Sequence, residues 1–280
     1  MILWGMSWLS AKYIALHFSN IELTFWRFLV TAIFAYLTLV YLGYTKFTIH
    51  KKSYIWLVLG GIFMGISQIA NFEGLKYGYA GMGSIVFNAT SPIFSFIISM
   101  IFFNKKFTPL QYFALILGSF GAALIFDVFK YGFDVVSKDG NLYFLANSIL
   151  FALVTFCSQM STRYTNVAVF SLFMGLFASI SMLPFCNYGI MLDIFKLDYI
   201  FWLNLIFNAG IAGGFGTTLY FSIASKIGGE YASSFIFLVP IVSVIGSSIV
   251  FGESINPSSL IGGGIAFLAV YLINANQKAS

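Results

Sequence analysis

The chain has 280 residues, of which 60% are hydrophobic and 8% are charged, and its formal net charge is +5. A soluble domain carries about 25% charged residues, so this composition excludes an ordinary water-soluble fold. In lipid only helices and closed barrels satisfy their backbone. Continuous apolar runs such as 110–125 favour helices over the alternating segments of a barrel. The basic residues form no stripe that follows phosphates, so no nucleic-acid partner is expected.

Apolar runs separated by charged or turn-rich breaks predict ten membrane spans, each near the ~20 residues that cross the hydrocarbon core. In chain order the predicted spans are 2–18, 23–43, 54–77, 82–103, 108–126, 142–162, 167–190, 199–225, 231–252 and 257–275. The N-terminus has no basic region and no small-residue cleavage site, so we interpret it as a first span and not as a removable signal peptide.

The two halves of the chain share landmarks in the same order. Gly60 aligns with Gly210 and Lys76-Tyr77-Gly78 with Lys226-Ile227-Gly228, and Pro92 and Pro109 align with Pro240 and Pro257. Chance matching in apolar sequence is the alternative, but four ordered landmarks favour a true repeat. We expect a first repeat at 1–127, a loop at 128–141, a second repeat at 142–275 and a tail at 276–280. Five spans per repeat is an odd number, so the second repeat must enter the membrane in the opposite direction to the first. The predicted fold is therefore all-α, with ten transmembrane helices in two inverted five-helix repeats.

Basic residues in the loops predict the orientation of the chain. With a cytoplasmic N-terminus, the inner loops carry Lys46, Lys51, Lys52, Lys105, Lys106, Arg163, Lys226 and Lys278, and the outer loops carry Lys76, Lys130, Lys138 and Lys196. Lys105 aligns with Glu253, and inversion places the cation inside and the carboxylate outside. We expect both termini in the cytoplasm and the protein in the cytoplasmic (inner) membrane of a bacterium.

Short motifs occur at ordered places along nearly the whole chain. They are Leu3-Trp4-Gly5, Trp26-Arg27-Phe28, Gly74-Leu75-Lys76-Tyr77, Ser91-Pro92, Ala224-Ser225-Lys226, Pro240 and Phe251-Gly252-Glu253. Their order and spacing resemble the EamA family of the drug/metabolite transporter (DMT) superfamily. One departure is Lys105, where that family usually has Glu. The resemblance implies ten spans, a central cavity between the halves and alternating access. It does not fix the substrate, which ranges over amino acids, nucleotide-sugar-like metabolites and drugs.

Three charged residues, Lys12, Arg27 and Glu73, lie within predicted spans. Each such charge costs at least ~2.5–3.5 kcal/mol at the bilayer centre on insertion scales. In the predicted topology each lies ~6–9 Å of helix from the outer end, so all three can share one layer. Our hypothesis is an outer gate or a site for a substrate carboxylate, with Lys12 or Arg27 as the cation and Glu73 as its partner. A structural salt-bridge network, or side chains that extend to the headgroups, is the alternative.

Prolines and polar residues within spans are further candidates. Pro92 removes the hydrogen bond to the carbonyl of Asn88, and Pro240 does the same for Ile236. Inverted-repeat transporters bind substrate where helices are interrupted near the midplane, although membrane helices also tolerate proline without function. We expect the cavity to be lined by Gln68, Asn71, Asn88, Ser158, Gln159, Thr218 and Tyr220. The GxxxG pairs Gly61–Gly65 and Gly210–Gly214 predict close helix packing within the chain.

A membrane enzyme is the main alternative class, but the sequence has no HExxH motif and no paired intramembrane aspartates. Cys157 and Cys186 lack CxxC spacing, so we expect no metal and no cofactor. The resemblance implies secondary transport of small metabolites, such as amino acids or their derivatives, and we expect a monomer or homodimer in a lipid bilayer. The resemblance also makes export in exchange for protons the preferred mode, and we expect Glu73 as the proton carrier. Facilitated import of a small solute and translocation of a lipid or lipid-linked carrier are the alternatives.

Overall fold

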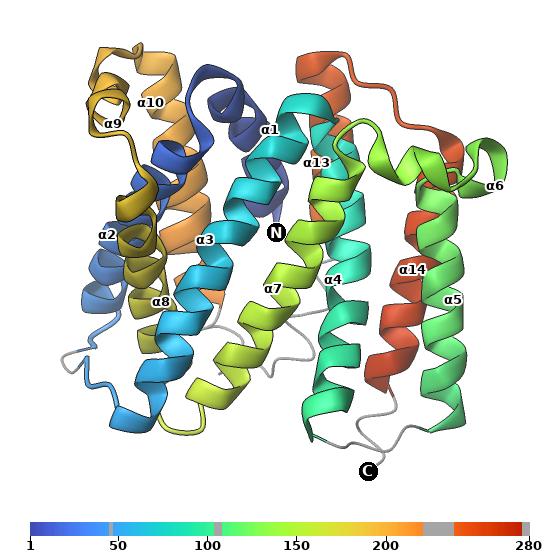
Figure 1. The fold of residues 1–280 in the computed structure, drawn as a ribbon, viewed down its shortest axis with the longest axis horizontal. Helices are drawn as coiled ribbons and strands as arrows, with labels where there is room; N and C mark the ends of the chain where they lie inside the picture. The colour runs from blue at the N-terminus through green and yellow to red at the C-terminus, as the bar shows by residue number, and fades with distance from the viewer. Residues whose placement is uncertain (45–46, 104–107, 221–237, 276–280) are drawn as a thin grey trace.

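The computed structural model describes residues 1–44, 47–103, 108–220 and 238–275. The regular structure in these ranges is helical, and the helices run between two ends of the molecule (Figure 1). The first half forms α1 (Ile2–His17), α2 (Asn20–Tyr41), α3 (Tyr54–Tyr77), α4 (Ala80–Phe103) and α5 (Pro109–Ile125). Local chemistry sets several helix ends. For example, Thr108 and Gln111 form a capping box at the start of α5, with Pro109 in its first turn.

The second half forms α7 (Asn141–Ser161), α8 (Val167–Met182), α10 (Tyr199–Leu205), α13 (Leu238–Phe251) and α14 (Pro257–Ala275). The helix α10 continues without a break into a π-helix, η5 (Ile206–Gly216). Short helices lie in the connections: η1 (Lys51–Ser53), α6 (Val128–Tyr131), η2 (Phe133–Ser137), η3 (Leu183–Phe185), α9 (Tyr188–Asp193) and η4 (Ile194–Lys196).

Each of the ten predicted spans overlaps one of these helices. The prediction for 167–190 extends too far, because α8 ends at Met182 and the chain turns into η3, which contains Pro184. Residues 221–237, which include parts of two predicted spans, lie outside the described residues. Within the described ranges, four helices are long and apolar enough to cross a membrane, and shorter apolar helices accompany them. The four are Asn20–Tyr41, Lys51–Tyr77, Asn141–Ser161 and Tyr199–Tyr220.

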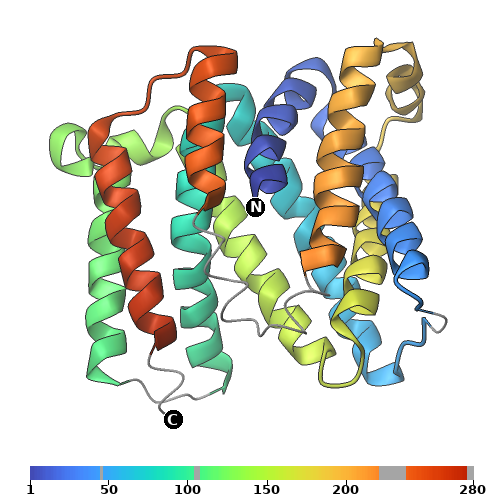
Figure 2. The ribbon, with the colours of Figure 1, turned by 180° about the vertical axis from the view of Figure 1, so that it is seen from behind.

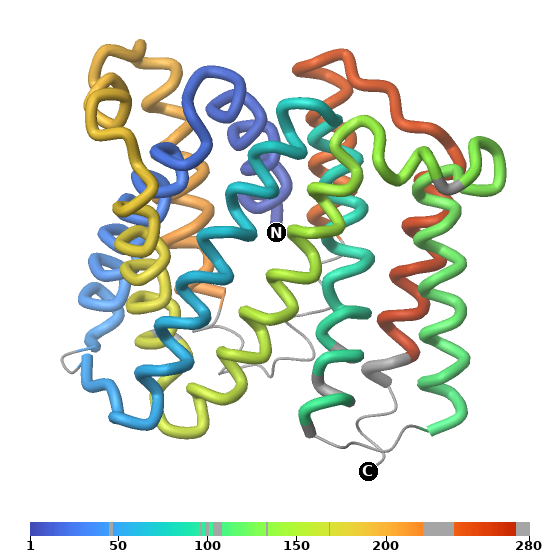
Figure 3. The backbone as a smooth tube through the Cα atoms, viewed as in Figure 1, coloured from blue at the N-terminus to red at the C-terminus, as the bar shows by residue number. Residues whose placement is uncertain are grey.

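The connections gather at two ends of the molecule, which we call upper and lower as drawn in Figure 1. The upper end carries the connections α1–α2, α3–α4, α5–α7, α8–α10 and α13–α14, as the chain trace in Figure 3 shows. The lower end carries the α2–α3 and α7–α8 connections. The helix α1 runs upward and α7 runs downward, so the first helices of the two halves have opposite directions.

Many of the main helix contacts join one half to the other. The helix α3 packs against α7 and α8, α4 against α7, α2 against α8 and η5, and α5 against α14. The helix α1 lies between α13 and the α10–η5 helix (Figure 2). The helices of the two halves correspond in chain order: α1 to α7, α2 to α8, α3 to α10–η5, α4 to α13 and α5 to α14. When each helix of a contacting pair is replaced by its counterpart, the result is another contacting pair. The α3–α8 pair then becomes η5–α2, and the α4–α7 pair becomes α13–α1.

The GxxxG pairs lie in two of these contacts. A Cβ atom added to Gly61 of α3 would lie 2.6 Å from the Phe177 Cβ of α8. A Cβ atom added to Gly214 of η5 would lie 2.6 Å from the Phe34 Cβ of α2. Glycine at these positions lets the helices approach closely. The predicted packing role within the chain is therefore confirmed.

Candidate functional site

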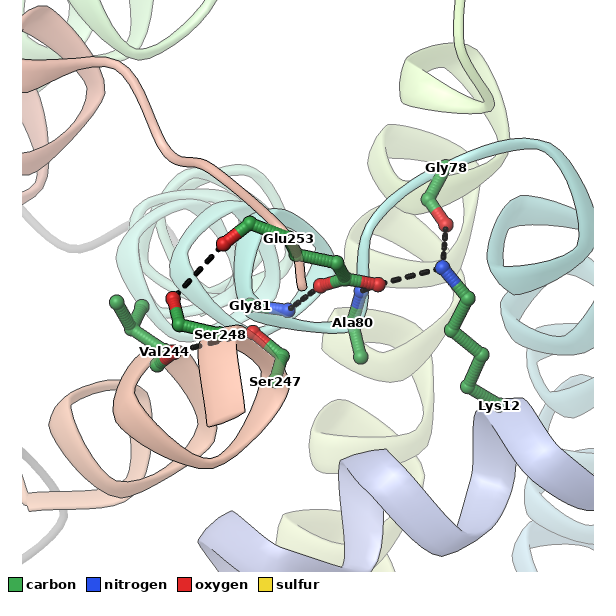
Figure 4. Close-up of polar contacts among 8 residues, drawn as sticks. All are labelled: Lys12, Gly78, Ala80, Gly81, Val244, Ser247, Ser248 and Glu253. Carbon is green, nitrogen blue, oxygen red and sulfur yellow. Dashed lines mark hydrogen bonds and ion pairs between the residues drawn. The ribbon is translucent and has the colours of Figure 1, made fainter. Parts of the chain in front are cut away.

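The ammonium group of Lys12 lies in a buried polar contact at the upper end (Figure 4). Its Nζ lies 2.5 Å from Oε1 of Glu253 and donates a hydrogen bond of 2.9 Å to the carbonyl of Gly78. The side chains of Lys12 and Glu253 are 13% and 2% exposed. Lys12 lies on α1, whereas Glu253 follows the end of α13 and the positive-φ residue Gly252. The contact therefore joins the first and second halves of the chain.

The carboxylate of Glu253 is also held by the backbone of α4. It accepts hydrogen bonds from the N–H groups of Ala80 at 3.1 Å and Gly81 at 3.3 Å (Figure 4). The first N–H groups of a helix have no partner within the helix, and its N-terminus favours negative charge. Glu253 thus caps α4 from the other half. We call the contact of Glu253 with Lys12 and with the start of α4 the latch.

Two aromatic rings complete the surroundings of the Lys12 ammonium group. The rings of Tyr79 and Phe251 each lie 5.4 Å from its Nζ, measured to the ring centroid. This is within the ~6 Å over which a ring face attracts a cation. In the described part of the chain, the latch contains the only ion pair between the halves. The other two, Lys76–Glu73 and Lys196–Asp193, join residues three apart on one helical segment.

A second charged group, Arg27, connects three helices below the upper end. Its Nε donates to Oδ1 of Asn208 at 2.8 Å, and Nδ2 of Asn208 donates to the carbonyl of Ser7 at 2.8 Å. The contact joins α2, η5 and α1. Among the described residues, no carboxylate lies within ion-pair distance of Arg27. A neutral amide therefore orients the guanidinium group without cancelling its charge.

The π-helix η5 offers backbone carbonyls to both of its neighbours. Nε1 of Trp4 on α1 donates to the carbonyl of Ala212 at 3.0 Å, and the hydroxyl of Thr31 on α2 donates to that of Ala209 at 2.9 Å. π-Helical segments are rare and occur frequently at functional sites. This irregular helix was not predicted. The glycine-rich sequence of 206–216 was the available signal.

A buried polar seam joins α3 and α7. The hydroxyl of Ser67 donates to Oδ1 of Asn147 at 2.5 Å, and Nδ2 of Asn147 donates to Oδ1 of Asn71 at 3.3 Å. The neighbouring Gln68 is also buried, and its Nε2 has no hydrogen-bond partner among the described residues. Gln68 and Asn71 were predicted as cavity positions, and the structure places Asn71 in the seam and Gln68 beside it.

Comparison with known proteins identifies the family. The sequence model of the EamA-like transporter family matches residues 1–127 and 138–275. The chain belongs to the EamA-like transporter family. This is a family of transporters within the DMT superfamily and not a family of enzymes. The family resemblance found in the sequence motifs is therefore confirmed.

Curated relatives of this EamA-family protein match most of its length. The chain is 22% identical to the uncharacterized transporter YoaV of Bacillus subtilis, over 97% of this chain and 92% of that protein. It is 24% identical to an uncharacterized transporter of Archaeoglobus fulgidus, over 96% of this chain and 94% of that protein. A solved crystal structure superposes with a TM-score of 0.62 at 15% identity and covers 99% of this chain and 95% of its own. The last match shows the fold alone.

The predicted pairing of Glu73 with Lys12 or Arg27 is wrong. The Oε1 atom of Glu73 lies 3.9 Å from Nζ of Lys76 on the same helix, and both side chains are about 30% exposed.

Glu73 is also not the only acidic residue within a span. Glu22 lies buried in the first turn of α2, where its carboxylate accepts hydrogen bonds from the Asn187 N–H at 2.7 Å and from the Ser19 hydroxyl. The sequence interpretation missed Glu22 because it lies before the predicted start of that span.

The remaining predicted cavity residues do not lie in one layer. Ser158 and the exposed Gln159 lie in the last turn of α7, and Gln159 is ~18 Å along the helix from Asn147. Buried Thr218 follows η5, and the ring of Tyr220 lies 5.1 Å from that of Trp4. The residues expected to line the cavity therefore lie in groups at different depths.

The two prolines interrupt no helix among the described residues. Pro92 lies inside α4, which continues to Phe103, and the nearby Asn88 side chain donates to the carbonyl of Ser84 at 2.8 Å. Pro240 is buried in α13. The carbonyl of Ile236, the predicted consequence of Pro240, lies outside the described residues, as do Lys105 and the motif Ala224-Ser225-Lys226.

A cavity of about 480 Å³ lies at the upper end beside the latch. It is lined by the α3–α4 turn, the α5–α7 connection and the α13–α14 connection, and its lining includes Tyr79, Asp127, Asp139 and Asn256. None of the predicted cavity residues lines it.

Proposed function

We propose that this EamA-family protein is a secondary transporter of a small polar metabolite, such as an amino acid or an amino-acid derivative. In this proposal the solute crosses the cytoplasmic membrane of a bacterium by alternating access around a cavity between two inverted five-helix repeats. The protein acts as an exporter driven by proton exchange. The proposal rests most on one observation: Arg27 lies within a span with a neutral amide partner, as argued below.

The packing of the helices supports two inverted repeats. The contacts between halves exchange in pairs, and the first helices of the halves run in opposite directions. The glycine-mediated α3–α8 contact corresponds to the glycine-mediated η5–α2 contact. Inverted-repeat transporters bind substrate at the interface between their repeats, so this two-fold relation supports our proposal of a site there.

Charges at the two ends support the orientation. Eight of the nine acidic residues of the chain lie in the connections and end turns of the upper end: Glu22, Glu73, Asp127, Asp134, Asp139, Asp193, Asp198 and Glu253. In the described ranges the lower end carries Lys51, Lys52 and Arg163, and the connections and end turns of the upper end carry Lys76, Lys130, Lys138 and Lys196. Over the whole sequence, the predicted inner loops carry eight Lys and Arg residues and the predicted outer loops carry four. Because cytoplasmic loops of membrane proteins are enriched in Lys and Arg, the lower end is the cytoplasmic one in our proposal.

Arg27 supports a solute that carries a carboxylate group. A guanidinium group presents donors in a planar fork that matches a carboxylate, and an uncompensated charge within a span is costly. Lys12, the other cation considered from the sequence, is already paired with Glu253. Arg27 is therefore the better candidate to bind the carboxylate of an amino acid.

Proton coupling, in this proposal, uses a buried carboxylate near the upper end. Glu73 was the residue expected from the sequence, but Glu22 and Glu253 are more deeply buried. A change in protonation affects contacts more strongly at a buried group, because the local dielectric is lower. We therefore propose Glu253 and Glu22 ahead of Glu73 as the coupling carboxylates.

The test is transport by purified protein in proteoliposomes. Amino acids, their derivatives and neutral solutes are screened, with and without a pH gradient, for the wild type and for Arg27→Gln. Arg163→Gln, which removes the same charge at the lower end, is the matched control. We expect solute movement that depends on the gradient and that is lost in Arg27→Gln only. Full activity of folded Arg27→Gln contradicts the role of Arg27. Movement without a gradient favours facilitated import, and movement of lipidic substrates alone favours a translocase.

A further inference from the structure

The surroundings of the Lys12 ammonium group have the composition of a site for an ammonium ligand. They comprise the carboxylate of Glu253 at 2.5 Å, the carbonyl of Gly78 at 2.9 Å, and the rings of Tyr79 and Phe251 at 5.4 Å. We call these four residues the ammonium cage. We propose that the cage is an ammonium-binding site that Lys12 occupies while the upper end is closed. A solute that carries an ammonium group takes the place of Lys12 when that end opens, and this second step rests on the proposed transport function.

The walls of the cage do not depend on Lys12 for their position. Gly78 and Tyr79 belong to the α3–α4 turn, and Phe251 and Glu253 belong to the end of α13 and the following connection. Glu253 is fixed separately by the N–H groups of Ala80 and Gly81. Lys12 enters from a third element, α1. Removal of its side chain should therefore leave a preformed acceptor site, and preorganisation of this kind favours binding of a small ligand.

The chemistry of the cage selects a cation. A carboxylate and a carbonyl accept hydrogen bonds and donate none, and an ammonium group has three donors and no acceptor. The faces of the two aromatic rings carry negative partial charge, which attracts a cation and repels an anion. An alcohol of the same shape offers one donor and no charge. The cage should therefore discriminate strongly between a primary amine and its hydroxyl analogue.

Opening of the upper end links this site to transport. The helices α1 and α13 pack closely below the latch: a Cβ atom added to Gly5 would lie 2.6 Å from the Val242 Cβ, and one added to Gly246 would lie 2.9 Å from Cδ2 of Leu9. Separation of these helices withdraws Lys12 from Glu253. A buried carboxylate that loses its cation is strongly destabilised. An ammonium-bearing solute removes this penalty, whereas a neutral solute does not.

Chemical rescue of Lys12→Ala tests the site without any transport assay. The free amine n-propylammonium has the length and charge of the part of the side chain that Lys12→Ala removes (Cγ to Nζ), and n-propanol is its uncharged control. We expect n-propylammonium to raise the melting temperature of Lys12→Ala in a saturable manner, and n-propanol to have no such effect. The wild type, whose cage is occupied, should not respond to the amine. Lys76→Ala, which removes a partly exposed lysine from the same end, should not respond either.

The companion variant Lys12→Ala with Glu253→Gln identifies the site of rescue. We expect it to bind n-propylammonium about tenfold more weakly or worse, since the loss of a charged partner is worth more than about 1.4 kcal/mol. If Lys12→Ala does not remain folded on purification, both variants are purified in amine and in alcohol. Recovery of folded Lys12→Ala with the amine alone then supports the cage. Three results overturn the cage: an equal response to amine and alcohol, no response to either, or rescue that persists in the double variant Lys12→Ala with Glu253→Gln.

A separate measurement addresses the exchange step. Once a transported solute is found, its ammonium group is replaced by hydroxyl, and the rates of the two compounds are compared in proteoliposomes. Faster transport of the amine supports exchange with Lys12, and equal rates overturn it. A failed rescue contradicts the cage alone, whereas an absence of transport for every solute contradicts the proposed function, so the two failures are distinguishable.

Discussion

Lys12 and Glu253 are 241 positions apart in the chain, yet the ammonium nitrogen of one lies 2.5 Å from a carboxylate oxygen of the other. The same carboxylate caps the N-terminus of α4. One side chain of the second half therefore holds two helices of the first half, α1 and α4, at the upper end. In an alternating-access transporter, a contact of this kind must break whenever that end opens.

The latch should control access to the space below it. Ser247 of α13 is fully buried under the latch, close to Gly81. In a background with Cys157 and Cys186 replaced, we expect Lys12→Met to increase the labelling rate of Ser247→Cys by a membrane-impermeant thiol reagent. The cause is the lost attraction between α1 and Glu253.

A buried cysteine elsewhere provides the control for this labelling. Ser148 of α7 is also fully buried and makes the same kind of hydrogen bond to its own helix, so Ser148→Cys should stay unlabelled. Equal labelling of both positions would indicate general loosening of the fold and would contradict a local gate.

Removal of one partner of the latch should destabilise the protein more than removal of a partly exposed ion pair. Glu253→Ala leaves two α4 N–H groups without their acceptor and Lys12 without its counter-ion, and breaking a buried pair costs up to about 3–5 kcal/mol. Glu73→Ala breaks a partly exposed, 3.9 Å contact worth about 0–1 kcal/mol. The measurement is thermal or denaturant unfolding in detergent.

The same unfolding measurements give the coupling between the two partners. The double variant Lys12→Met with Glu253→Gln should cost less than the sum of its single variants, because residues in contact are not additive. Additive costs would show that the two side chains do not interact.

Asn208 should determine whether Arg27 can bind a carboxylate. In Asn208→Asp the new carboxylate pairs with the guanidinium group and competes with a solute carboxylate. We expect at least a tenfold loss in the transport of a carboxylate-bearing solute, and little change for its amide or ester. Asn204→Asp, which introduces the same charge at a partly exposed position of α10, is the control. Unchanged transport of the carboxylate solute by folded Asn208→Asp would refute the assignment.

Close packing of η5 on α2 should make Gly214 intolerant of a larger side chain. A Cβ atom there would lie 2.6 Å from the Phe34 Cβ and 2.7 Å from the carbonyl oxygen of Thr31. Gly214→Val should therefore lower stability by about 1–3 kcal/mol. Gly264 of α14 has no atom within 4 Å of an added Cβ, so Gly264→Ala should leave the melting temperature unchanged or slightly raised. A neutral effect of Gly214→Val would contradict the close contact.

The sequence by itself determined that the chain forms apolar helices, where most of them begin and end, and which glycines lie at close contacts. These properties are local: a span depends on a continuous apolar run, and its end depends on a glycine, a proline or a capping residue within a few positions. Gly61 and Gly214 could be recognised in the same way, because the spacing of small residues on one helix reveals a packing face.

Only the tertiary structure decided the partners of the charged residues. Nothing in the sequence around Lys12 distinguishes Glu253 from Glu73, because an ion pair depends on which helices pack together and at what depth. The partner of Arg27 is an asparagine on a π-helix, and its place depends on how η5 fits between α1 and α2. A buried charge takes the partner that the packed helices bring within reach, since an unpaired charge is costly there.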